Sequence, residues 1–223
     1  MPGNVGTLVL AIHDPVWFEF VLERVKKRAV RYTLYREDMY IPPRSVIYSD
    51  CDDCLKGLRG SDDVVVVLDR EHSCVNFERA FALLALGRKE GYRRLLVGVD
   101  MGKKLAYVIL GDDILLDYGY IDEGSIHVIW RELSCYPARE VVIRASDLRI
   151  LRKFLEGIKS LSARPVLEIV DEGGSSRMGP SISPASPRGA FEKDKNLRAA
   201  LEIAYRKGVS ISGLNEARRR GGH

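Results

Sequence analysis

The segment LLVGVDMGKKLAYVIL, residues 95–110, contains two apolar runs that are separated by a short polar stretch. Each run has the length and composition of a buried β-strand, and Gly102 between them favours a tight turn. The segment therefore predicts two neighbouring strands of one sheet. Asp100 closes the first run, where an acidic residue is uncommon. Its carboxylate either shapes the turn or binds a cation at the end of the strand.

The residues that follow add a third strand and then alternate helix with strand. A Gly-Asp-Asp turn at 111–113 leads into an apolar run at 114–122, so an antiparallel meander is expected. The remaining elements are expected as a helix near 124–133, a strand at 140–146, a helix at 147–161, a strand at 165–172 and a helix at 194–208. The predicted order for residues 92–210 is β-β-β-α-β-α-β-α, followed by a basic tail at 211–223.

The first 91 residues predict a small α/β unit with a mostly parallel sheet. The run DVVVVLD, residues 63–69, is apolar on both faces, as a central parallel strand should be. Helical spacing is found in residues 15–29 and 76–92. No glycine-rich phosphate loop follows a strand, and we expect His13 and Asp14 to serve helix capping rather than ligand binding.

The composition is that of a globular protein, with 46% hydrophobic and 30% charged residues in a chain of 223. No apolar run approaches the ~20 residues of a membrane span, and the first ten residues lack the basic region of a secretory signal. A cytoplasmic protein without a membrane partner is therefore expected. The absence of Gln and the presence of only two Thr fit a thermophile. The net charge of +4 is compatible with nucleic-acid binding without requiring it.

Cys51 and Cys54 form a C-x-x-C motif, and no second pair of cysteines has this spacing. A zinc site would need two more ligands of this kind. A redox site would need a lowered thiol pKa, whereas the neighbouring Asp50, Asp52 and Asp53 would raise it. We therefore expect a stabilising disulfide here rather than a redox or metal site.

Three segments of the second half resemble the RuvC-type and YqgF-type resolvase-like nucleases. GVDMGKKLA, residues 98–106, is similar to the first-strand motif G-h-D-x-G-x-K-x-x-G, which it matches at the Asp, the Gly after it and the Lys. VDEGGSS, residues 170–176, is similar to the D-E-R-x-S-T motif of YqgF-type members, with Gly173 at the position of the Arg.

The third segment, DKNLRAALEIAY at 194–205, is similar to the final Ala-rich helix of the family. Family members place an Asp three or four residues before the Ala pair. In this sequence Asp194 lies five residues before Ala199. The match at this helix is therefore displaced from the pattern of the family.

The resemblance covers roughly residues 93–209 and implies a ribonuclease H-like domain. It implies hydrolysis of phosphodiester bonds in structured DNA or RNA with Mg²⁺ or Mn²⁺, and a homodimer, because resolvases of this kind cut as dimers. Carboxylates supply the hard oxygen ligands that Mg²⁺ prefers. The expected metal ligands are Asp100, Asp147, Asp171, Glu172 and Asp194, of which Asp100, Glu172 and Asp194 are the expected catalytic residues.

Several of these acids have a second interpretation. Asp147 and Asp194 each stand at the start of a predicted helix and could be its N-cap. Asp171 and Glu172 are neighbours, and the alternation of side chains in a strand allows only one of them to face the site. The motif favours Glu172.

The residues expected to contact nucleic acid are Lys103, Lys104, Ser175, Ser176, Arg177 and Arg188. The last of these belong to a Pro- and Ser-rich segment, residues 177–195, which is either a lid over the acids or a connector. Two other functions stay open. One is a nucleic-acid-binding or adaptor protein on a nuclease fold that has lost catalysis. The other is an ATP-dependent phosphotransferase of the actin-like kind, which would need a second phosphate-binding motif.

Overall fold

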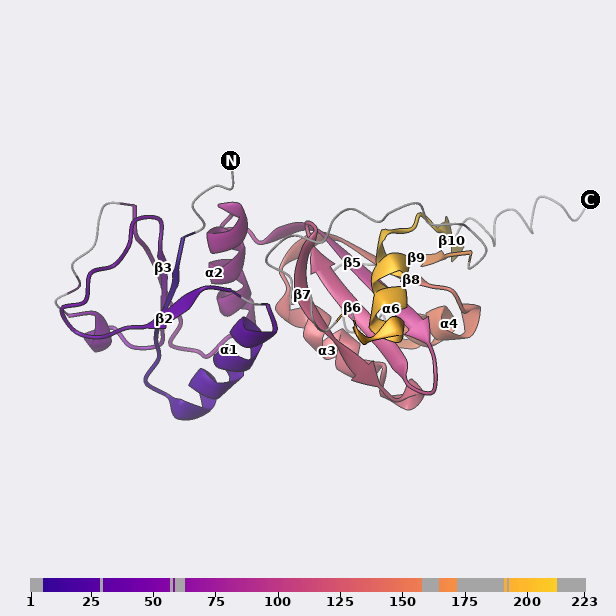
Figure 1. Cartoon of the computed structure of the whole chain (residues 1–223), viewed down its shortest axis with the longest axis horizontal. Helices are drawn as coiled ribbons and strands as arrows, with labels where there is room; N and C mark the ends of the chain where they lie inside the picture. The colour runs from indigo at the N-terminus through magenta and orange to yellow at the C-terminus, as the bar shows by residue number, and fades with distance from the viewer. Residues whose placement is uncertain are drawn as a thin grey trace, which may run out of the picture. The chain divides into compact units, whose positions relative to one another are not determined.

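A computed structural model of the chain describes residues 6–28, 30–56, 58, 63–157, 165–171, 191 and 193–211 (Figure 1). The chain divides into two compact units. The first comprises Met1–Tyr92 and Ser134–Pro137, and the second comprises Arg93–Leu133 and Ala138–His223. None of the helices in the described ranges combines the length and the apolar character that a membrane span requires.

The first unit contains a four-stranded parallel sheet in the order β2-β1-β3-β4. Its strands are β1 (Leu8–Ala11), β2 (Tyr32–Leu34), β3 (Val46–Ser49) and β4 (Val65–Leu68). β1 and β3 are buried along their whole length, as expected for parallel strands covered on both faces. β4 was expected to be central but lies at an edge, where Val66 and Leu68 are partly exposed. A β-branched run also suits a half-buried edge strand, which explains the error.

Helices α1 (Pro15–Lys27) and α2 (Cys74–Leu86) cover one face of this sheet, where Leu10, Val21 and Phe77 share a core cluster. The other face is covered by the connections around Ile41 and by the short 3₁₀ helix η1 (Asp53–Leu55). The predicted capping role of Asp14 is confirmed, because its carboxylate accepts a hydrogen bond from the backbone N–H of Trp17 at 2.7 Å.

A buried ion pair and a disulfide hold the elements of the first unit together. The Arg28 guanidinium, just after α1, donates two hydrogen bonds to Glu78 of α2, of 3.0 and 2.5 Å, and both side chains are almost fully buried. The Tyr92 hydroxyl donates a third bond to Glu78 at 3.1 Å. Cys74 at the start of α2 forms a disulfide with Cys135 of the segment Ser134–Pro137.

The second unit contains a six-stranded mixed sheet in the order β10-β9-β8-β5-β6-β7. Its strands are β5 (Tyr92–Met101), β6 (Leu105–Gly111), β7 (Ile114–Ile121), β8 (Ala138–Ala145), β9 (Val166–Ile169) and β10 (Val209–Ser210). The predicted antiparallel meander is confirmed in β5, β6 and β7. β8 and β9 are parallel, and β10 adds an antiparallel edge strand that the sequence did not predict.

Three helices accompany this sheet: α3 (His127–Cys135), α4 (Leu148–Gly157) and α6 (Lys195–Tyr205). The described elements from β5 to α6 thus follow the predicted order, with an additional 3₁₀ turn η2 (Glu123–Ser125) before α3. In Figure 1, α6 crosses in front of the sheet, whereas α3 and α4 lie behind it. Trp130 of α3 packs edge-on against Phe154 of α4, with ring centroids 5.4 Å apart.

Candidate functional site at the strand ends of the second unit

Asp100 lies near the end of the central strand β5, on the face of the sheet that α6 covers. It is the register partner of Ala106 in β6, which in turn pairs with Tyr120 in β7. Directly opposed residues of antiparallel strands share a face, and Ala106 belongs to the core cluster that contains Ala200 of α6. Asp100 and Tyr120 are therefore directed to the α6 side of the sheet.

Gly98 sets the distance between α6 and the central strand. A Cβ atom at this position would lie 2.0 Å from the carbonyl oxygen of Ala200 and 2.6 Å from the backbone nitrogen of Ala204. Only glycine lets the helix backbone approach β5 this closely. This contact brings α6 close to the half of β5 that contains Asp100.

A buried arginine fixes the end of the same helix. Arg144 of β8 donates a hydrogen bond of 2.7 Å to Glu168 of β9 and one of 2.6 Å to the carbonyl oxygen of Ala204. The guanidinium is a suitable partner for a carbonyl at a helix C-terminus, where the helix dipole is negative. Arg144 therefore connects two strands of the sheet to α6.

A pocket of about 220 Å³ forms where these elements meet. It is lined by Asp100, Ser146, Val170, Asp171, Ala199, Glu202, Ile203 and Arg206. The ends of β5, β8 and β9 thus contribute to one cavity, which a face of α6 closes. Three acidic residues from distant parts of the sequence, Asp100, Asp171 and Glu202, are among the residues that line it.

Arg206, the C-cap residue of α6, places a positive charge among these acids. Its guanidinium donates one hydrogen bond to the Glu202 carboxylate and one to the backbone oxygen of Asp171, each of 3.3 Å. A guanidinium in this position could bind the oxygens of a phosphate. The pocket therefore combines anionic groups with a cation that suits an anionic ligand.

Asp194 caps α6 and does not line this pocket. Its Oδ1 atom accepts hydrogen bonds from the backbone N–H groups of Asn196 and Leu197 and from the Tyr120 hydroxyl, at 3.0, 3.2 and 2.5 Å. The bond from Tyr120 and these two amides lower the pKa of Asp194. Partial burial, together with the bond to Asp194 and the charges of Asp194 and Asp100, raises the pKa of Tyr120 to about 12.

Asp147 also acts as a helix cap. Its carboxylate accepts a hydrogen bond of 2.7 Å from the backbone N–H of Arg149, in the first turn of α4, and the Arg149 guanidinium lies 2.6 Å from it. The side-chain and backbone hydrogen bonds from Arg149 hold the pKa of Asp147 below its usual range. Ser146, rather than Asp147, is the residue that lines the pocket after β8.

The remaining predicted residues divide into two groups. Lys103 and Lys104 are exposed in the turn between β5 and β6, and Lys104 forms an ion pair of 3.6 Å with Asp122. This turn lies beside the start of α6, because a Cβ atom on Gly102 would be 3.5 Å from the Asn196 amide nitrogen. The predicted residues Glu172, Ser175, Ser176, Arg177 and Arg188 lie outside the described residues.

The acidic residues of the pocket are the described residues that bear on the predicted Mg²⁺ or Mn²⁺ site. Carboxylate oxygens are the ligands that Mg²⁺ and Mn²⁺ prefer. Among the residues that the structure describes, no group of three His, Cys, Asp or Glu side chains could hold a metal ion. A cation bound here would therefore need oxygens from water or from a ligand as well.

Tyr120, Glu202 and Arg206 are site residues that sequence reasoning missed. Glu202 and Arg206 were recognisable in one respect, because they are four residues apart on a predicted helix and so share a face with each other. The direction of that face depends on how α6 packs on β5, which the helical spacing does not reveal. For Tyr120 no signal separated it from Tyr118, the other tyrosine of its strand.

Comparison with known proteins gives little further information. No family model matches the chain, and no curated protein matches it. A solved structure of Marinitoga piezophila Argonaute in complex with a 5′ OH guide RNA is similar to it at a TM-score of 0.27 and 10% sequence identity. That match covers 78% of this chain and 41% of the Argonaute chain, so the chain spans less than half of the length of that protein.

Proposed function

We propose that the second unit is a ribonuclease H-like domain that binds nucleic acid and hydrolyses phosphodiester bonds at the Asp100 pocket with a divalent cation. The observation that carries the proposal is the meeting of Asp100, Asp171 and Glu202 in one cavity. The strand order β7-β6-β5-β8-β9, with the first strand of the meander at the centre, supports the ribonuclease H-like arrangement.

Asp100 and Asp171 are the described residues best placed to hold Mg²⁺ or Mn²⁺. Glu172 is proposed as a further ligand because it matches the Glu of the D-E-R-x-S-T motif. One or two carboxylates are sufficient for Mg²⁺ when water and substrate phosphate supply the remaining ligands. When bound, such an ion supplies an activated water and stabilises the negative charge that develops on the phosphate.

The residues around the pocket would position the substrate. Arg206, held by Glu202 and the Asp171 backbone, would donate hydrogen bonds to a phosphate oxygen in the pocket. Lys103 and Lys104 on the adjacent turn, together with exposed Lys195 at the start of α6, would neutralise neighbouring phosphates. The proposal therefore predicts binding that weakens as the salt concentration rises.

Cleavage of labelled four-way junction, duplex, RNA–DNA hybrid and single-stranded substrates in Mn²⁺ tests the proposal. We expect Asp100→Asn to lower the rate by about 100-fold or more, because it removes a charge in contact with the reacting groups. Asp113→Asn is the matched control, because Asp113 lies in the β6–β7 turn at the other end of the strands. Its backbone has φ 69°, which asparagine tolerates. Equal rates in the two variants, or no cleavage by the unmodified chain, would contradict catalysis at Asp100.

A second function, nucleic-acid binding without hydrolysis, is favoured by two observations. The carboxylate of Asp194 is already bonded to Tyr120 and to the first turn of α6. Arg206 places a fixed cation beside Glu202, in the cavity where a metal ion would lie. Calorimetric titration separates the two functions: a catalytic site binds Mn²⁺ and loses it in Asp100→Asn, whereas a binding domain retains salt-dependent affinity for nucleic acid without binding Mn²⁺.

A further inference from the structure

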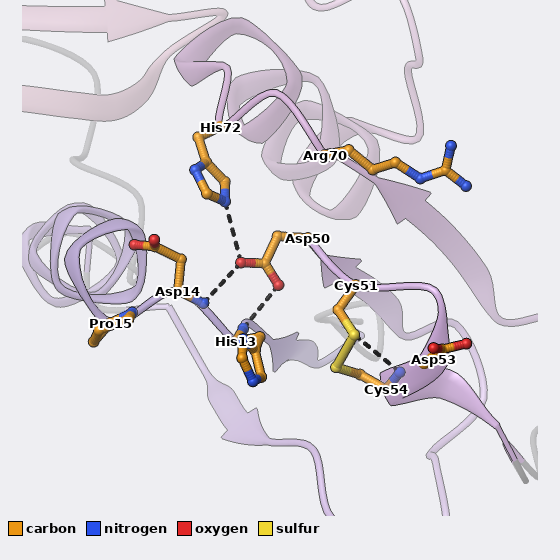
Figure 2. Close-up of a pocket in the computed structure, with 9 residues that line it drawn as sticks. All are labelled: His13, Asp14, Pro15, Asp50, Cys51, Asp53, Cys54, Arg70 and His72. Carbon is orange, nitrogen blue, oxygen red and sulfur yellow. Dashed lines mark hydrogen bonds and ion pairs between the residues drawn. A yellow bond between two sulfur atoms is a disulfide. The ribbon is translucent and has the colours of Figure 1, made fainter.

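The first unit has its own pocket, of about 870 Å³, at the carboxyl ends of its strands (Figure 2). It is lined by His13, Asp14, Pro15, Asp50, Cys51, Asp53, Cys54, Arg70 and His72. These residues follow β1, β3 and β4, where open parallel sheets bind their ligands. A disulfide between Cys51 and Cys54 lies at this pocket and is partly exposed.

The two disulfides of the chain differ in kind. Cys74 and Cys135 are 61 residues apart, and Cys135 is buried. Cys51 and Cys54 are three residues apart, so their bond closes only a very short loop. Because the stabilisation by a disulfide increases with the length of the loop that it closes, the Cys51–Cys54 bond contributes less to stability than the Cys74–Cys135 bond. The Cys51–Cys54 disulfide is partly exposed, so an external thiol can reach it for thiol–disulfide exchange.

Asp50, which the sequence alone suggested would disfavour a thiolate, has its negative charge compensated. Its carboxylate accepts hydrogen bonds from the backbone N–H groups of His13 and Asp14, at 2.7 and 3.0 Å, and from the His72 ring at 3.2 Å (Figure 2). Burial by itself would raise the pKa of Asp50, but these hydrogen bonds hold it below its ordinary value. Its side chain is only 4% exposed.

The other two neighbouring acids are paired with cations. Asp52 accepts a hydrogen bond of 2.7 Å from the Arg70 guanidinium. Asp53 forms an ion pair of 2.8 Å with Lys56. With these partners, the acids around the motif do less to oppose a negative sulfur than their number in the sequence suggests.

Of the two cysteines, Cys51 has the sulfur that is better stabilised as a thiolate. The backbone N–H of Cys54 donates a hydrogen bond of 3.1 Å to the Cys51 sulfur (Figure 2). A hydrogen bond to the sulfur stabilises its thiolate form, which lowers the pKa of a thiol and makes it a better leaving group.

We propose that Cys51 and Cys54 form a redox-active pair that exchanges with a dithiol. A thiolate of the dithiol attacks the Cys54 sulfur, forms a mixed disulfide and releases Cys51 as a thiolate that takes up a proton. The second thiol of the dithiol loses its proton and attacks the dithiol sulfur of the mixed disulfide. This step releases Cys54 as a thiolate, which also takes up a proton. The dithiol is thereby oxidised to a disulfide, and the motif gains two electrons and two protons.

Reduction of the full chain by dithiothreitol tests the proposal, with alkylation of free thiols and mass spectrometry of each cysteine peptide. We expect Cys51–Cys54 to open at least about 10-fold faster than Cys74–Cys135 while circular dichroism shows the fold unchanged. Reduced glutathione in place of dithiothreitol shows whether a monothiol suffices. The proposal is overturned when both disulfides open together, or when Cys51–Cys54 opens no faster than it does in a chain unfolded by urea.

Single variants identify the reactive sulfur. In Cys54→Ser the remaining Cys51 thiol should react with iodoacetamide at pH 7 several-fold faster than the Cys54 thiol of Cys51→Ser. Arg70→Gln removes the partner of Asp52 and should slow the reaction of Cys51. Lys56→Gln should change it less, because the ion pair of Lys56 with Asp53 is more exposed to solvent than that of Arg70 with Asp52. Equal thiol reactivity in the two cysteine variants would overturn the assignment of Cys51 as the leaving group.

Discussion

Asp50 of the first unit and Asp100 of the second occupy comparable places, each at the end of a buried strand and beside a pocket. The Asp50 carboxylate is almost buried and accepts three hydrogen bonds, two of them from backbone amides. Asp100 shares its pocket with the carboxylates of Asp171 and Glu202 and with one guanidinium. Position at a strand end is therefore not sufficient to identify the role of an acid, because the two acids have different neighbours.

The two units also differ in where they place their reactive groups. In the first unit the carboxylates are compensated, and the accessible chemistry belongs to the sulfur atoms of Cys51 and Cys54. In the second unit the acids themselves line the cavity, and α6 holds Glu202 and Arg206 against the sheet. The second pocket depends on the contact between Gly98 of β5 and the backbone of α6.

Gly98→Ala should have the largest effect. The added methyl group would overlap the backbone of α6, which no change of rotamer can relieve, so we expect a loss of about 3 kcal/mol in the free energy of unfolding. Gly124→Ala is the control, since no atom lies within 4 Å of a Cβ at that position. Urea unfolding followed by circular dichroism measures both. A loss in Gly98→Ala no larger than that in the control would show that α6 does not rest on β5 as described.

Asp50→Asn and Asp100→Asn compare the two strand-end acids directly. Loss of the charged acceptor of two backbone amides should cost about 2 kcal/mol in Asp50→Asn. Asp100→Asn exchanges a carboxylate for an amide of similar shape at the wall of a pocket, so its stability should stay within about 1 kcal/mol of the unmodified chain. Denaturant unfolding measures both values, and equal losses would remove the distinction between a structural and a functional acid.

Tyr120→Phe should have a smaller effect on stability and a specific effect on Asp194. Removal of the hydroxyl takes away the bond that does most to lower the pKa of Asp194, which should then rise toward its ordinary value of 3.8. Two-dimensional NMR of the Asp194 carboxyl during acid titration measures this change. The two backbone amides of α6 remain, so the helix itself should persist. An unchanged pKa would show that Tyr120 is not the main partner of Asp194.

Much of the fold follows from local patterns in the sequence. The apolar runs on either side of Asp100 are sufficient to predict β5 and β6, because strands of this composition must be buried. The Gly-Asp-Asp turn predicts the hairpin to β7, in which Asp112 and Asp113 take positive φ angles. The cap residues Asp14, Asp147 and Asp194 could be suggested from their places before helical segments.

The parts that escaped prediction depend on contacts between distant residues. Gly98 gives no sign in the sequence that a helix a hundred residues later will rest on it. Gly208, just before the short strand β10, lets the chain approach β9 closely, because a Cβ there would lie 2.7 Å from the Cβ of Glu168. The compensation of Asp50 by the amides of residues 13 and 14 is likewise invisible without coordinates. The sequence therefore predicts where the strands end, whereas the partners of the acids at those ends are known only from the structure.

The smallest predicted effect is a loss of stability in alkaline solution that depends on Tyr120. Its pKa of about 12 in the folded chain exceeds the ordinary value of 10.0, so the folded state holds the phenolic proton more tightly than the unfolded state. The contribution to stability is therefore complete below pH 10 and is lost as the pH rises through about 12. Tyr205 also has a pKa raised to about 12, by burial and by the charge of Asp113, and will add to the fall. The difference between the unmodified chain and Tyr120→Phe isolates the Tyr120 contribution, and urea unfolding at intervals from pH 8 to pH 12 should show this difference shrinking toward zero. A difference that stays constant across this range would contradict the raised pKa of Tyr120 in the folded chain.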